Sequence, residues 1–263
     1  MPFIQYLLFH IPTFLLGFLI VAVYVSSTVI GLVIIRKFYP YNRCKNHNEI
    51  AGFIFATLGV IYAVILAFTV VVTWEQFDKA DDITSREANC IASLYQDAMP
   101  LPADFRERLR GGLTDYVNTI INDEWLAMQK GQRSPKVDEL QEKLIASYSG
   151  FQPKNETQKI FFTESIKKLN EANELRRERL LYAATGINSI LYFVLFVGSF
   201  ITIAFSMLFG TENFKEHLIM SSCLAAMIAI ALFTIIALDY PFTGKYIIEP
   251  DVFIKILPTL LGR

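Results

Sequence analysis

The sequence predicts an all-α polytopic membrane protein with four transmembrane helices and a helical soluble insert between the second and third. Composition is the first reason, because 53% of the 263 residues are hydrophobic, only 19% are charged and the mean hydropathy is +0.39. Charge placement is the second, because most charged residues fall between Glu75 and Arg179. The third is that the rest of the chain contains four stretches without Asp, Glu, Lys, Arg or His, each long enough to span a bilayer.

These four stretches divide the chain into membrane and soluble parts. They cover about residues 13–35, 51–73, 186–209 and 218–238. A helix needs about 20 apolar residues to cross a hydrocarbon core about 30 Å thick, so each stretch qualifies. The predicted parts are an N-terminal membrane half (1–73), the insert (74–182), a C-terminal membrane half (183–242) and a tail (243–263). We expect residues 1–12, which include several aromatic residues, to lie along the membrane surface.

Within the insert, apolar residues recur at helical spacing. The second span continues into it without a Gly or Pro break, and apolar residues three and four apart predict a further helix from about Phe105 to Trp125. Ser134 and Pro135 fit the N-cap and first position of a shorter helix. A charged helical segment follows over about residues 156–181 and can run straight into the third span.

Sequence patterns typical of enzymes, metal sites and nucleotide sites are missing. There is no HExxH, no GxGxxG and no P-loop, and the Cys and His residues do not have ligand spacing. A net charge of −1 gives no reason to expect nucleic-acid binding. Carboxylates of the insert have basic neighbours three or four residues away, such as Glu139 with Lys143, which indicates solvated helix faces. The sequence therefore predicts no catalytic residue, metal or cofactor.

The second span carries two stripes at helical spacing. One consists of small residues, which allow close helix packing in lipid: Gly52, Ala56, Gly59, Ala63 and Ala67. The other runs from larger apolar to hydroxyl-bearing residues: Leu58, Tyr62, Leu66, Thr69 and Thr73. If several copies surround an axis, this second stripe, the ladder, is predicted to line a pore with an apolar constriction that gates by dewetting. Otherwise the ladder packs against the first and fourth spans of the same chain.

Aromatic and acidic residues at the ends of the second and fourth spans predict a junction at the membrane interface. They are Trp74, Glu75, Asp239, Pro241 and Phe242. The spans themselves contain no ionisable residue, which disfavours proton-coupled transport. A pore and a non-conducting scaffold therefore both stay open.

The alternatives to a pore make their own predictions. A scaffold whose insert docks a partner protein predicts an exposed apolar stripe at Trp125, Leu126 and Met128. A membrane enzyme needs a polar cluster at one interface, for which Glu75, Asp78 and Asp239 are the only candidates. An interfacial network that orients the second and fourth spans explains these three carboxylates better.

Two short segments resemble a known family. Residues 62–80 (YAVILAFTVVVTWEQFDKA) resemble the second membrane helix of the bestrophins and its cytosolic continuation, which Arg86, Glu87, Leu94 and Tyr95 extend. Residues 238–244 (LDYPFTG) are similar to the Asn-Pro-Phe-Gly segment after the last bestrophin membrane helix. The order of spans and insert also resembles that of the bacterial bestrophin-like group.

This resemblance implies a homopentameric ion channel of the bacterial inner membrane, with the insert and both termini in the cytoplasm. The second span would line one central pore for inorganic ions, and the resemblance leaves two registers open for its neck. One places it at Leu58, Tyr62 and Leu66; alignment on Trp74 moves it to Ala56, Val60 and Val64. Charge favours a cytoplasmic insert only slightly, and the ion selected is left open.

The chain departs from the bestrophins that bind calcium. Those proteins have an acidic run directly after their Pro-Phe-Gly, whereas here only Glu249 and Asp251 follow. Two carboxylates are too few to predict a calcium site, since Ca²⁺ takes six to eight oxygen ligands.

Overall fold

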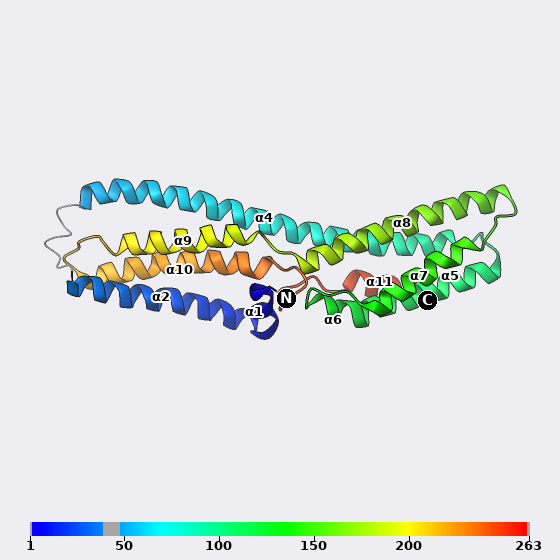
Figure 1. Ribbon diagram of the computed structural model, residues 1–263, viewed down its shortest axis with the longest axis horizontal. Helices are drawn as coiled ribbons and strands as arrows, with labels where there is room; N and C mark the ends of the chain where they lie inside the picture. Colours follow the sequence, from blue (N-terminus) through cyan, green and yellow to red (C-terminus); the bar gives the residue numbers. More distant parts are fainter. Residues whose placement is uncertain (1, 39–47, 262–263) are drawn as a thin grey trace. The chain divides into compact units, whose positions relative to one another are not determined.

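The computed structural model describes residues 2–38 and 48–261, and these residues form helices without any strand. Its elements are α1 (Phe3–His10), α2 (Thr13–Phe38), α4 (Asn48–Asp97), α5 (Ala103–Thr119), the π-helix η1 (Ile120–Glu124), α6 (Trp125–Met128), α7 (Pro135–Ser149), α8 (Glu156–Ala184), α9 (Ser189–Ser206), α10 (Phe214–Leu238) and α11 (Asp251–Leu260) (Figure 1). Four helical segments, in α2, α4, α9 and α10, are long and apolar enough to cross a membrane. The predicted all-α fold and the number of spans are thereby confirmed.

The chain forms two compact units. Unit 1 contains Met1–Phe9, Gln76–Thr185 and Tyr240–Arg263, and unit 2 contains His10–Glu75 and Gly186–Asp239. Unit 2 therefore holds the four membrane-spanning segments. Unit 1 holds the insert together with α1 and the C-terminal segment.

In unit 2, glycines allow large side chains to approach neighbouring helices closely. Helix α10 contacts both α2 and α9 (Figure 1). A Cβ at Gly17 of α2 would lie 2.9 Å from the Phe233 ring of α10, and one at Gly31 would lie 2.9 Å from the Met207 sulfur. Small residues at helix contacts are the usual means of close packing in lipid. Here they lie on α2 and α9.

The closest of these contacts gives a testable prediction. A Cβ at Gly198 of α9 would lie 2.5 Å from the Tyr62 ring of α4, so Gly198→Ala must displace that ring. We expect a loss of about 1–3 kcal/mol in the free energy of unfolding, typical of an overpacked site, measured by thermal melting in detergent. Gly111→Ala is the matched control, because nothing lies within 4 Å of the carbon that it adds. Equal melting temperatures for the two variants would contradict the contact.

Local signals set the starts of the helices in unit 1. The Ser134 hydroxyl accepts a hydrogen bond from the Val137 amide (3.4 Å) and Pro135 is the first residue of α7, which confirms the predicted cap. Asn155 caps α8 through the Gln158 amide (2.8 Å).

The third span begins as a separate helix. Helix α8 ends at Ala184, and the Asn188 side chain caps α9 by accepting a hydrogen bond from the Ile190 amide (2.9 Å). The Ile187 amide between the two helices donates to Asp239 (2.6 Å) instead of continuing the helix. Of the two possibilities that the sequence left open, the structure has a break at residues 185–188 between the insert and this span.

Candidate functional site

The predicted pore ladder lies on the side of α4 that packs within unit 2. Tyr62 is only 6% exposed, and its hydroxyl donates a hydrogen bond to the Leu195 carbonyl of α9 (3.1 Å). Thr69 and Thr73 are also buried, and each donates its hydroxyl to a carbonyl one turn earlier in α4. Both leucines of the ladder are partly buried. Tyr62, Thr69 and Thr73 of the ladder are thus buried inside one chain, and the Tyr62 hydroxyl is bonded to the third span.

A different side of α4 is uncovered in the described part of the chain. Val60 is 63% exposed and Val64 is 48% exposed, and Ala56 is exposed as well. These three residues form the second of the two registers that the sequence left open. We call this side, with its three residues, the valine face of α4.

The small-residue stripe lies beside the valine face and shares Ala56 with it. A Cβ at Gly52 or Gly59 would meet nothing within 4 Å, and the three alanines of the stripe are exposed. Among the described residues, the stripe therefore does not pack one helix of the chain against another. Its role in helix packing stays a prediction that concerns a neighbouring copy.

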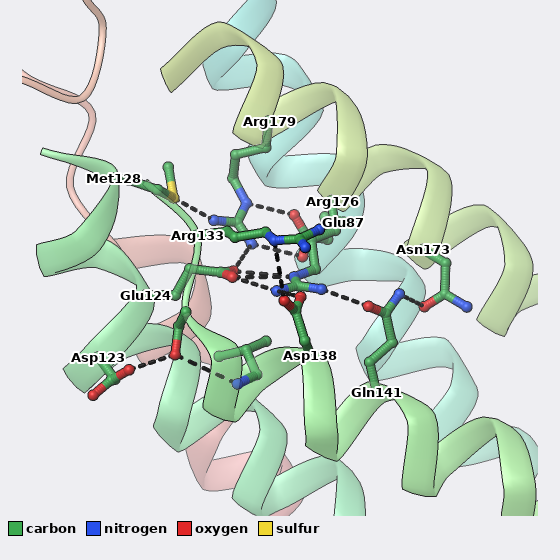
Figure 2. A network of polar contacts seen from close by, with 12 residues as sticks. Glu87, Asp123, Glu124, Met128, Arg133, Asp138, Gln141, Asn173, Arg176 and Arg179 are labelled. Atoms are coloured by element: carbon green, nitrogen blue, oxygen red, sulfur yellow. Dashed lines mark hydrogen bonds and ion pairs between the residues drawn. The ribbon is translucent and has the colours of Figure 1, made fainter. Parts of the chain in front are cut away.

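Unit 1 contains four charged side chains that are buried together (Figure 2). They are Glu87 of α4, Glu124 of η1, and Arg176 and Arg179 of α8, which we call the buried ionic cluster; each is at most 4% exposed. Arg179 forms two bonds with Glu87 (2.6 and 3.0 Å) and a third with Glu124 (2.9 Å). Arg176 donates its Nε–H to both Glu124 oxygens (3.2 Å each) and its Nη2 to Asp138 of α7 (2.9 Å).

Polar and aromatic neighbours complete the surroundings of the two arginines. Gln141 of α7 accepts a further hydrogen bond from Arg176. The Arg179 guanidinium lies 5.2 Å from the Trp125 ring centroid and 5.6 Å from that of Phe253, at cation–π distance. With its bonds to Asp138 and Gln141, the cluster therefore connects α4, η1, α7 and α8 through charge-assisted hydrogen bonds, and α11 adds the Phe253 ring.

Electrostatics keep Glu124 ionised. Burial alone would raise its pKa, but the guanidinium groups of Arg179 and Arg176 more than offset that effect and hold the pKa below its usual range. Burial, together with the nearby charge of Glu87, raises the pKa of Tyr116 beside the cluster. This closed network holds its four charged side chains away from the surface, each paired with a group of opposite charge.

The prediction of solvated faces for the charges of the insert is correct only in part. The Glu139–Lys143 pair of α7 is a surface ion pair, with both side chains 66% exposed and 2.6 Å apart. Arg176 and Arg179, however, lie on the buried face of α8. A signal for this was present, because both continue the three- and four-residue spacing of the small and apolar residues buried on the same helix: Leu169, Ala172 and Ala183.

The C-terminal segment covers the apolar surface that a docking scaffold would expose. The Trp125 indole donates a hydrogen bond to the Ile248 carbonyl (3.0 Å), and its ring packs edge-on against Phe242 and Phe253. Trp125 is 4% exposed and Met128 is fully buried. The predicted exposed stripe is therefore wrong for these two residues, because the chain supplies its own cover; only Leu126 is exposed (61%).

Asp239 makes a separate buried contact in unit 2. Its carboxylate, on a residue only 1% exposed, accepts hydrogen bonds from the Ile187 amide (2.6 Å) and the Tyr192 hydroxyl (2.8 Å). Burial raises its pKa to about 6, although both bonds act in the opposite direction. Asp239 thus connects the end of α10 to the break before α9.

The predicted junction residues are distributed over both units, and their common role at the membrane interface stays a prediction. Trp74 and Glu75 are exposed on α4, whereas Asp239 is buried in unit 2 and Phe242 in unit 1. The Pro241 carbonyl accepts a hydrogen bond from the Ile248 amide (2.8 Å). Across residues 2–38 and 48–261, no group of three or more His, Cys, Asp or Glu residues is arranged to hold a metal ion.

Comparison with known proteins identifies the relatives of this fold. The family model of the bestrophin-like domain matches residues 22–253. A crystal structure of a bacterial bestrophin homologue from Klebsiella pneumoniae is 13% identical, covers 92% of this chain and 97% of its own, and has a TM-score of 0.68. A variant of that homologue has a TM-score of 0.70 at 13% identity, with coverages of 92% and 99%. No curated protein sequence matches the chain.

Proposed function

Because this chain belongs to the bestrophin-like family, we propose that several copies of it form an ion channel in the bacterial inner membrane. Bestrophins are ion channels, and the four membrane-spanning segments fit that role. A homopentamer with a cytoplasmic insert and cytoplasmic termini is the arrangement that the family resemblance favours. The proposal assigns no catalytic residue and no resident cofactor.

The valine face of α4 is the lining that we propose for the pore. The observation that carries this assignment is the exposure of Val60 and Val64, while Tyr62 on the ladder is buried in the same chain. A side chain packed inside the protomer is not available to line a pore on the symmetry axis. In this proposal the valine face replaces the ladder as the apolar constriction, and the other residues of the small-residue stripe contact the neighbouring copy.

Polar substitution on this face should open the constriction. Val64→Thr changes shape very little but adds a hydroxyl, which favours water in a narrow apolar ring. We expect ion flux into liposomes that contain the purified protein to rise several-fold over wild type, for Val64→Thr and likewise for Val60→Thr. Val72→Thr is the matched control, because Val72 lies on another side of the same helix and is 40% exposed.

Further measurements distinguish the two registers proposed for the pore lining, and they distinguish a channel from a non-conducting scaffold. If the ladder lined the pore, Leu66→Ala would raise flux and the valine variants would not. The channel proposal fails if neither wild type nor any variant conducts ions although a size measurement confirms a folded oligomer. A non-conducting scaffold would then be the better interpretation, with a surface other than the covered stripe at Trp125.

A further inference from the structure

Helix α1 turns aromatic rings outward and a polar side chain inward. Phe3 is 74% exposed, Tyr6 is 50% exposed and Phe9 is 36% exposed, whereas Gln5 is completely buried. Leu8, which is 2% exposed, is buried on the same side of α1 as Gln5. Large apolar side chains usually point into a protein and amides usually point to water, so the exposed aromatic rings and the buried amide depart from the common arrangement. It suits a helix whose outer face meets an environment less polar than water.

Gln5 holds α1 in a fixed rotation about its axis. Its Nε2 donates hydrogen bonds to the Ala183 carbonyl (3.0 Å) and the Thr243 hydroxyl (3.1 Å), and Thr243 in turn donates to the Gln129 carbonyl (3.0 Å). Gly131, at φ +66°, closes the site, because a Cβ there would lie 3.0 Å from Gln5 Oε1. With the Gln5 amide bonded to other residues of unit 1, Phe3 and Tyr6 stay at least half exposed, and Phe9 stays 36% exposed.

Chain connectivity brings this aromatic face close to the bilayer. Helix α1 ends at His10 and the membrane-spanning α2 begins at Thr13, so about 10 Å of chain at most separates them. Phe14, the second residue of α2, is 87% exposed. The Lys130 ammonium lies 5.5 Å from the Phe9 ring centroid. Aromatic rings beside a cation are typical of the lipid headgroup region.

We propose that α1 is a membrane-surface helix that attaches unit 1 to the lipid headgroups through Phe3, Tyr6 and Phe9. The partner is a phospholipid surface, because only two residues join α1 to a helix long and apolar enough to cross the bilayer, and because the Lys130 cation lies beside the Phe9 ring. This role is independent of ion conduction, so it stands or fails separately from the channel proposal.

Spin-label accessibility in the reconstituted full-length protein tests this role. A single cysteine replaces Phe3 or Tyr6 in a background that lacks the native cysteines, which are Cys44, Cys90 and Cys223. The protein is placed in vesicles of phosphatidylcholine with a minor share of phosphatidylglycerol. Ile160→Cys on α8 is the matched control, because Ile160 is an apolar residue of unit 1 that is 64% exposed. All three side chains are at least half exposed, so labelling removes little packing.

Two reagents that collide with the spin labels, oxygen and a water-soluble nickel chelate, distinguish lipid from water around each label. In the headgroup region, labels at positions 3 and 6 should collide more with oxygen, which dissolves in lipid, and less with a water-soluble nickel chelate than the label at position 160. If all three labels have the same ratio, α1 faces water and the proposal is overturned. Low accessibility to both reagents at positions 3 and 6 also overturns it, because the rings are then covered by a second copy of the chain.

Discussion

Replacing Arg179 by Met is expected to lower the free energy of unfolding by about 3–5 kcal/mol, the range typical of breaking a buried ion pair from one side. Arg179 is fully buried and donates three hydrogen bonds to carboxylates, two of them to Glu87. Without it, Glu87 remains buried without its bidentate partner. Thermal or denaturant unfolding of the full-length protein in detergent measures the loss.

A surface pair provides the control for this substitution. Lys143→Met removes the partner of Glu139, but both side chains are 66% exposed, so the expected loss is about 0–1 kcal/mol. If Arg179→Met were no more harmful than Lys143→Met, the cluster would not stabilise unit 1.

A double variant tests the cause of the Arg179→Met loss. Adding Glu87→Leu removes the carboxylate that the single variant strands, so the double variant should recover part of the lost stability. Glu124 keeps its bonds to Arg176 in this background. A double variant less stable than Arg179→Met would contradict the explanation by an uncompensated charge.

The sequence predicts those parts of the fold that depend on local signals. Ser134 and Pro135 place the start of α7, because a hydroxyl cap and a proline at the first position act within one helical turn. The four spans follow from the length of the apolar stretches, which requires no knowledge of their neighbours.

Sequence alone does not predict which side of α4 packs inside the chain. Tyr62 and Val64 are both apolar enough for lipid, so hydrophobic patterning does not distinguish a protein contact from an exposed surface inside a bilayer. The deciding contact is with Gly198 of α9, a residue far away in the chain whose missing side chain makes room for the Tyr62 ring.

The buried ionic cluster depends on long-range pairing in the same way. Glu87 and Arg179 are 92 residues apart, and the local rule of ion pairs three or four residues apart assigns such charges to a solvated surface. Only the position of the two arginines on the apolar face of α8 indicated burial, and it did not identify their partners.

The stability of unit 2 should depend on pH through Asp239. Its pKa is about 6 in the folded protein, against an ordinary value of 3.8. Because the folded pKa is raised, the contribution of Asp239 to stability is fully present below about pH 4 and is lost as pH rises through about 6. At 1.36 kcal/mol per pKa unit, the total loss is about 3 kcal/mol.

Two variants isolate this contribution. Asp239→Asn does not titrate, so its unfolding free energy, measured from pH 4 to pH 7.5, should lack this decrease, while all other groups contribute as in wild type. Tyr192→Phe removes a hydrogen bond that favours the carboxylate (2.8 Å), so the decrease should move to higher pH. If the Asp239→Asn and wild-type curves are parallel, the pKa of Asp239 in the folded protein is not raised above its ordinary value. If the two curves differ as predicted, protonation of this one buried carboxylate stabilises unit 2, in which Asp239 contacts Ile187 just before α9.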